Sequence, residues 1–127
     1  MRKLLVLLLC LFQVSPVFAH AHLEKEYQMY WAKAHAAQTE VVLEDKTRVD
    51  CVTAEYALEV DFASKWAESI GQSLYYGIKT GKKPAVLLIM ENGNKDVKYL
   101  KRLQTVAHKY DITVFTITRE YYERNCK

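Results

Sequence analysis

Two alternating stretches separated by only two residues, 47–53 and 56–61, constrain the fold of this chain most strongly. Each stretch alternates apolar with polar positions and is rich in β-branched and aromatic residues, as strands are. The short Ala54-Glu55 connection predicts an antiparallel hairpin, whose register follows from the length of the turn. The pairs that this register places opposite one another are Thr53 with Tyr56, Asp50 with Glu59, and Arg48 with Asp61.

Apolar periodicity predicts the remaining elements. Steps of three and four residues indicate helices over 23–37, 64–79 (with Ser64 as the N-cap) and 96–109. Apolar runs bounded by turn residues indicate further strands over 39–43, 85–90 and 112–117, and we make no assignment for the tail after residue 118. This order of elements predicts an α/β protein with a mixed β-sheet flanked by helices.

Residues 1–19 have the pattern of a secretory signal peptide. Arg2 and Lys3 precede the apolar run 4–14, and small residues follow near Ala19. The run is shorter than the roughly 20 apolar residues of a typical membrane-spanning helix. We therefore expect a single domain, 20–127, that is periplasmic or secreted and not inserted in the membrane after cleavage; an uncleaved N-terminal anchor is the alternative.

Composition bounds the function of the mature chain. The sequence is 50% hydrophobic and 26% charged, which is typical of a globular domain. Removing Arg2 and Lys3 lowers the formal net charge from +3 to about +1, so nucleic-acid binding would need a local basic patch. The lysines available for such a patch are Lys79, Lys82, Lys83, Lys95, Lys98 and Lys101. Cys51 and Cys126 either form a disulfide in the exported chain or remain a buried thiol and a free thiol in the tail.

The predicted register brings two carboxylates together. Asp50 and Glu59 would have Cβ atoms about 5 Å apart, on the strand face opposite the core residues Val49, Cys51, Leu58 and Val60. Like charges in this arrangement repel, and a divalent cation would remove the repulsion by taking both as oxygen ligands. A solvated acidic face, partly neutralised by Arg48 beside Asp61, is the alternative. On the following helix Lys65, Gln72 and Tyr76 lie on one line, apart from the apolar stripe.

These residues resemble the motifs of a nuclease superfamily. Asp50 followed by Glu59-Val60-Asp61 is similar to the acidic motif of the PD-(D/E)XK superfamily, and Gln72-x-x-x-Tyr76 resembles a motif of its RecB-like and Holliday-junction-resolvase-like branches. The resemblance implies a restriction-endonuclease-like fold with an αβββαβ core. Asp61 stands where the family motif has a lysine, and Lys65 would replace that lysine from the start of the next helix.

The resemblance also implies an activity: metal-dependent hydrolysis of phosphodiester bonds, with DNA as the expected partner. Asp50 and Glu59 would bind Mg²⁺ or Mn²⁺, assisted by the Val60 carbonyl. Asp61, Lys65 and an upstream carboxylate, Glu40 in preference to Glu26, would complete the catalytic group. Gln72, Tyr76 and Arg48 would contact the nucleic acid.

Two other functions fit the sequence. The aspartate in the lysine position allows a nuclease fold that has lost catalysis and binds metal or nucleic acid. Cleavage after Ala19 would instead place His22 third from a free amine, in the His20-Ala21-His22 sequence. That arrangement could chelate Cu²⁺ in a periplasmic copper-binding protein.

Overall fold

The computed structural model describes residues 19–127, so most of the expected signal peptide lies outside the described residues. The helices are α1 (Glu24–Ala34), α2 (Trp66–Thr80), α3 (Val97–Tyr110) and α4 (Arg119–Asn125), with short 3₁₀ turns η1 (Ala63–Lys65) and η2 (Gly93–Lys95). The strands are β1 (Gln38–Val42), β2 (Arg48–Val52), β3 (Tyr56–Phe62), β4 (Lys83–Met90) and β5 (Thr113–Thr118).

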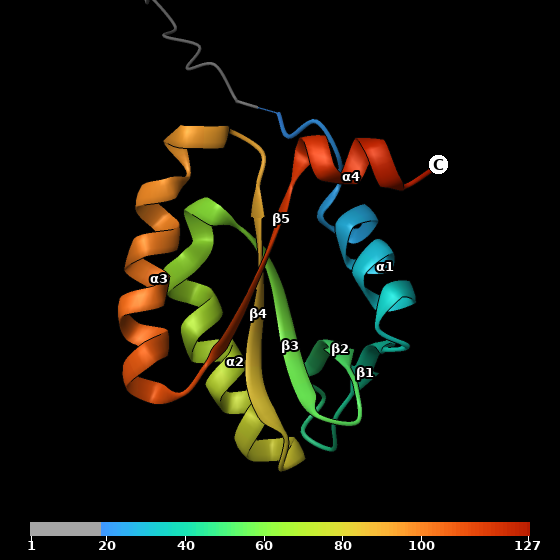
Figure 1. The fold of residues 1–127 in the computed structure, drawn as a ribbon. Helices are drawn as coiled ribbons and strands as arrows, with labels where there is room; N and C mark the ends of the chain where they lie inside the picture. The colour runs from blue at the N-terminus through green and yellow to red at the C-terminus, as the bar shows by residue number, and fades with distance from the viewer. Residues whose placement is uncertain (1–18) are drawn as a thin grey trace, which may run out of the picture.

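The strands form one mixed sheet in the order β1-β2-β3-β4-β5. The pairs β1–β2 and β2–β3 are antiparallel, whereas β3–β4 and β4–β5 are parallel. Helices α1 and α4 cover one face of the sheet, and α2 and α3 cover the other (Figure 1). The predicted α/β architecture with a mixed sheet flanked by helices is confirmed.

Strand β4 shows why an uninterrupted apolar run lies at the centre of the sheet. Its side chains alternate between the two faces, and helices cover both. Ala85, Leu87 and Ile89 pack under α1 and α4. Val86, Leu88 and Met90 pack under α2 and α3. No position of this central segment is available for a polar residue, since all six are buried.

The hairpin between β2 and β3 has the predicted register. Cys51 pairs with Leu58 and Val52 with Ala57, and the Thr53 N–H donates to the Tyr56 carbonyl over 3.0 Å. The turn lacks the Gly or Asn usual in such hairpins. The Thr53 hydroxyl compensates by accepting the N–H groups of Glu55 and Tyr56 over 3.2 and 2.8 Å.

Helix ends differ from the prediction in two places. Ser64 does not cap a helix: it lies within η1, and α2 begins at Trp66. The unassigned tail forms α4, whose N-cap Thr118 accepts the Tyr121 N–H over 3.2 Å. Gly81 ends α2 with φ +67°, a left-handed conformation that glycine adopts without steric cost.

Cys51 and Cys126 are not paired in this structure. Cys51 is fully buried among the residues between the sheet and α1, whereas Cys126 is exposed beyond the end of α4. A disulfide would need both sulfurs at one place, so the alternative with two free thiols describes this structure. Across residues 19–127, no helix combines the length and apolar character needed to cross a membrane.

Candidate functional site

Three carboxylates form a row across β1, β2 and β3. The pairs Thr39–Cys51 and Val41–Val49 bracket Glu40 and Asp50, which places these two residues opposite each other. The β2–β3 pairs are Cys51–Leu58 and Val52–Ala57, so the predicted Asp50–Glu59 strand pair is not formed. Asp50 is nevertheless close to Glu59, because its charge raises the pKa of Glu59. Like charges on adjacent strands repel, so this row is an unfavourable arrangement in the absence of a cation or a proton.

The backbone is distorted along this row. Glu40 has φ +54°, a conformation that costs a non-glycine residue about 1–2 kcal/mol. Asp50 Oδ2 accepts the Val60 N–H over 2.8 Å, where the ladder between β2 and β3 ends. The predicted common face of Val49 and Cys51 is therefore wrong: Cys51 packs on the α1 side, and Val49 packs with Tyr76 of α2.

The acidic face of β3 is buried rather than open to solvent. Glu59 and Asp61 are 6% and 5% exposed, and they share the face of β3 that also carries Ala57 and Ala63, beneath α2. The expectation of a non-core acidic face is therefore wrong, because α2 covers it. Glu59 Oε2 and Asp61 Oδ2 are buried and have no hydrogen-bond partner among the described residues. Orphaned carboxylate oxygens in a protein interior call for a cation, a proton or water.

Burial and mutual repulsion shift the pKa values of these carboxyls upward. Burial is the main cause for all three residues. The charges of Asp50 and Asp61 raise the pKa of Glu59 further, and that of Glu24 raises the pKa of Asp50. The pKa of Asp61 rises to about 7 through burial and the charge of Glu24, while Lys65 opposes the shift. Perturbed groups gathered in one place are typical of functional sites.

Glu40 is held by two neighbours outside its own strand. The Gln28 amide of α1 donates to Glu40 Oε1 over 3.0 Å and to the Asp50 carbonyl over 2.8 Å. The Arg48 Nε lies 2.7 Å from Glu40 Oε2. The predicted Arg48–Asp61 pair is wrong, since β2 pairs with β3 only at Cys51 and Val52 and Arg48 instead pairs with Val42 of β1.

The three predicted site residues that follow β3, Lys65, Gln72 and Tyr76, differ in how closely they approach the carboxylates. Lys65 is exposed at the start of α2, and its charge acts on both Asp61 and Glu24. Tyr76 is buried, and its pKa is raised by burial and by the charges of Glu59 and Asp50. Gln72 lies one turn before Tyr76 and is exposed. The charges of the carboxylates thus act on Lys65 and Tyr76 alike. The prediction that Tyr76 lies with Lys65 and Gln72 on one line apart from the core is wrong, because Tyr76 packs in the core against Val49 and Ala57.

Glu24 belongs to the site and was not predicted. It lies in the first turn of α1, and burial followed by the charge of Glu40 raises its pKa, against the charges of Lys65 and His20. The sequence signal was its spacing of four residues from Gln28, which places both on one helix face. Glu26, the weaker of the two predicted upstream carboxylates, instead accepts the Leu23 N–H over 2.6 Å at the start of α1.

A divalent cation at this site would need several oxygen ligands close together. Within residues 19–127 no group of three or more His, Cys, Asp or Glu side chains is arranged to hold a metal ion. Mg²⁺, however, is usually bound through one or two carboxylates, with waters and substrate oxygens as its other ligands. The neighbouring carboxylates Asp50 and Glu59, together with the orphaned Glu59 Oε2, meet that smaller requirement.

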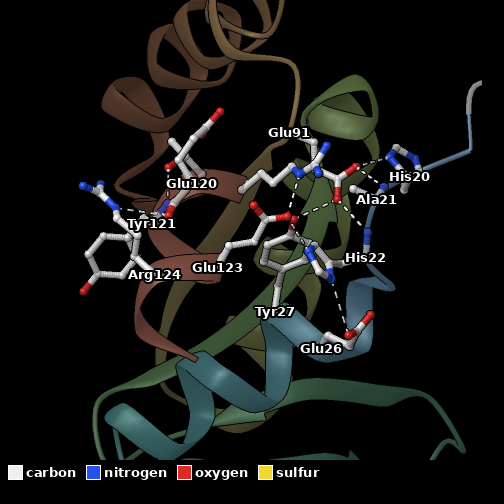
Figure 2. Close-up of polar contacts among 12 residues, drawn as sticks. His20, Ala21, His22, Glu26, Tyr27, Glu91, Glu120, Tyr121, Glu123 and Arg124 are labelled. Atoms are coloured by element: carbon white, nitrogen blue, oxygen red, sulfur yellow. Dashed lines mark hydrogen bonds and ion pairs between the residues drawn. The ribbon is translucent and has the colours of Figure 1, made fainter. Parts of the chain in front are cut away.

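A second polar cluster holds the segment before α1 (Figure 2). Glu91, at the end of β4, accepts the Ala21 and His22 N–H groups, each over 3.1 Å, and the Tyr27 hydroxyl over 2.8 Å. The His20 ring lies 3.0 Å from Glu91 and stacks on Phe62. A copper chelate at this segment would need the two N–H groups that Glu91 holds, so this structure gives the copper alternative no support.

Comparison of the chain with family models, curated proteins and solved structures finds no match.

Proposed function

We propose that this protein is an exported, Mg²⁺- or Mn²⁺-dependent nuclease that hydrolyses phosphodiester bonds of DNA. The observation that carries the proposal is the gathering of the half-buried Asp50 with the buried Glu59, whose pKa the charge of Asp50 raises, and with Asp61, on which the charge of Lys65 acts. The order α1-β1-β2-β3-α2-β4 matches the αβββαβ core that a restriction-endonuclease-like fold would have, which supports membership of the PD-(D/E)XK superfamily.

The residues of the site divide into ligands and positioning groups. Asp50 and Glu59 would bind the cation, and Glu40 and Asp61 would add negative charge around it. When bound, the cation would neutralise phosphate charge and lower the pKa of a coordinated water. Lys65 would stabilise the negative charge that develops on the phosphate during the reaction.

The nucleic acid would approach along the edges of α2 and β2. Gln72 and Arg48 are exposed there, and both have hydrogen-bond donors suited to phosphate oxygens. Tyr76 is mostly buried, which restricts it to its hydroxyl and favours a role in positioning the carboxylates. We propose contact with the substrate for Gln72 and Arg48 first.

Cleavage assays test the proposal directly. The mature chain is incubated with plasmid and with oligonucleotide DNA, in Mg²⁺, Mn²⁺ or EDTA, beside Asp50→Asn, Glu59→Gln and the exposed control Glu44→Gln. We expect cation-dependent cutting that falls about a hundredfold or more in the first two variants and persists in the control. Cutting that survives both substitutions, or that continues in EDTA, would contradict the proposal.

A second function is favoured by Asp61, which stands with an orphaned oxygen where the family motif has a lysine. In that case the site binds a cation and does not cut. Proton release on addition of Mn²⁺, lost in Asp50→Asn, together with no cleavage of any DNA form, would support this binding module. Lys65→Met separates the two functions: the nuclease proposal expects it to abolish cutting while the proton release remains.

A further inference from the structure

Helix α3 differs from the other helices in the sign of its charges. Helices α1, α2 and α4 carry both acidic and basic residues, whereas α3 has no carboxylate between Val97 and Tyr110. Its basic residues other than histidine, together with the lysine of the preceding turn η2, are all exposed: Lys95, Lys98, Lys101, Arg102 and Lys109. None of the five forms an ion pair within residues 19–127, where the salt bridges involve other elements.

The cations of α3 lie on one side of the helix. At about 100° per residue, Lys98, Lys101, Arg102 and Lys109 fall within an arc of about 100° around the axis. The opposite side packs into the core through Leu103 and Ala107. Helix α3 lies beside α2 on the same face of the sheet (Figure 1). We call this exposed arc the α3 basic face.

Contacts within α3 support this arrangement. Lys98 Nζ lies 4.8 Å from the centre of the Tyr99 ring, and Arg102 Cζ lies 5.8 Å from it. The cation–π attraction of the Tyr99 ring favours side-chain conformations that keep both Lys98 and Arg102 close to it. Asp96, just before α3, is buried and accepts the Asn92 N–H over 3.0 Å, so its carboxylate faces that turn.

The other expected basic patch, near the end of α2, is largely occupied by internal contacts. Lys82 Nζ donates to the Ala54 carbonyl, and Lys83 Nζ to Glu55 Oε1, both over 2.9 Å. These lysines stabilise the β2–β3 turn. Of the lysines that the sequence offers for phosphate binding, Lys79 at the end of α2 and the group on α3 and η2 remain available, and only the latter forms a cluster.

We propose that the α3 basic face binds the phosphate backbone of nucleic acid. Lys98 and Lys109 are eleven residues apart, which is about 16 Å along a helix, or about five base pairs of duplex DNA. The turn η1, which follows β3 and ends at Lys65, contacts α3, so the helix that carries the basic face packs against the segment next to Asp61. The choice of nucleic acid as the polyanion rests on the proposed nuclease function, and the new claim is the location of the binding surface.

Equilibrium binding without cleavage tests this surface. The probe is a fluorescent 20-base-pair duplex, titrated at several KCl concentrations in EDTA with the mature chain carrying Asp50→Asn. The test variant adds Lys98→Gln, Lys101→Gln and Arg102→Gln. The matched control removes the same charge from the opposite face and tail, through Lys25→Gln, Lys33→Gln and Lys127→Gln. All six side chains are exposed, so both variants are expected to fold.

We expect the α3 variant to bind at least tenfold more weakly near 0.1 M salt. The slope of log K against log [KCl] should fall in magnitude by about 2–3, which is roughly 0.9 for each lost phosphate contact. The control should stay within twofold of its parent. Equal weakening in both variants, no weakening in either, or binding of heparin with no binding of duplex or single-stranded DNA would each overturn the proposal.

The outcomes separate this inference from the nuclease proposal. If only the α3 variant binds more weakly and the protein with an unsubstituted site cuts no DNA, the binding-surface proposal stands and the nuclease proposal fails. If the protein with an unsubstituted site cuts DNA and the α3 substitutions change neither this cleavage nor the affinity, the nuclease proposal stands and the binding-surface proposal fails.

Discussion

Glu59 is the residue at which burial and charge conflict most strongly. It is almost fully enclosed, the charge of Asp50 acts on it, and one of its oxygens has no partner among residues 19–127. Burial, followed by the charges of Asp50 and Asp61, raises its pKa, so a proton is retained at neutral pH when no cation is bound. Binding of a divalent cation would displace that proton, and cation affinity should therefore increase with pH.

The same shifts predict how the stability of the metal-free protein depends on pH. Asp and Glu titrate near pH 4 in an unfolded chain, and the folded-state pKa values of Asp50, Glu59 and Asp61 lie above that. The stability that these groups contribute is present below about pH 4 and is lost as the pH rises through their folded values. We expect the Tm measured in EDTA to fall between pH 5 and pH 9.

Glu59→Gln should reduce this fall, because the amide needs no proton, and should raise the Tm at pH 9 above that of the unsubstituted protein. Glu44→Gln, at an exposed position, is the control and should follow the unsubstituted curve. Differential scanning fluorimetry across this pH range measures the effect. Identical slopes in all three proteins would show that Glu59 does not carry the predicted shift.

At the scale of elements, the kink in β1 places a carboxylate at the expense of backbone strain. Glu40 adopts φ +54° and is anchored by Gln28 and Arg48. Strained backbone that is held by its surroundings is common at functional sites. Glu40→Gly and Glu40→Ala lose the same side-chain contacts and differ in backbone freedom.

We therefore expect Glu40→Gly to be more stable than Glu40→Ala by about 1 kcal/mol, although glycine in a regular strand normally destabilises. Urea unfolding of both variants gives the comparison. Val41→Gly against Val41→Ala, at the next position of β1, is the control and should show alanine as the more stable residue. Greater stability of Glu40→Ala would mean that β1 relaxes to a regular strand when the carboxylate is removed.

The hairpin illustrates what the sequence could predict. The two-residue spacing between alternating stretches determined the β2–β3 register, and the continuous apolar run predicted a strand covered on both faces. These features follow from local period and turn length. The turn itself forms without Gly or Asn because Thr53 and Lys82 satisfy its backbone groups.

Features that depend on contacts between distant elements could not be predicted from the sequence. Alternation predicted one face for Val49 and Cys51. The Val60 N–H instead donates to the Asp50 carboxylate, the β2–β3 ladder ends there, and Val49 and Cys51 pack on opposite faces of the sheet. The burial of the acidic face depends on where α2 packs, and the role of Glu24 depends on how α1 crosses the sheet. Period and spacing carry no information on either.

At the scale of the whole molecule, α3 is the one helix of residues 19–127 with an excess of positive charge, although the net charge is small. The α3 basic face lies on the side of the sheet opposite α1 and α4, where acidic residues pair with His22 and Arg119 (Figure 2). Such a distribution would orient a polyanion toward one face during association. The overall charge of the chain, by contrast, gives no indication of this preference.

Glu91 joins parts of the chain that are distant in sequence. It connects the segment before α1 to the end of β4, while His22 extends the same cluster to Glu123 of α4 over 2.9 Å (Figure 2). Although burial opposes it, the donors around Glu91 lower its pKa, Tyr27 most strongly. The hydrogen bond that the protonated His22 ring donates to Glu123 is the main cause of the raised pKa of His22.

Glu91→Ala would leave several of these donors without an acceptor, each of which costs about 1–3 kcal/mol if it stays buried. We expect a loss of about 2 kcal/mol in the free energy of unfolding, and faster proteolysis of the segment before α1. Glu91→Gln keeps one acceptor oxygen, so its free energy of unfolding should lie between those of the unsubstituted protein and Glu91→Ala. Tyr27→Phe combined with Glu91→Ala provides the control, because a coupling near zero in this double-mutant cycle, measured by urea unfolding, would show that the clamp does not connect α1 to β4.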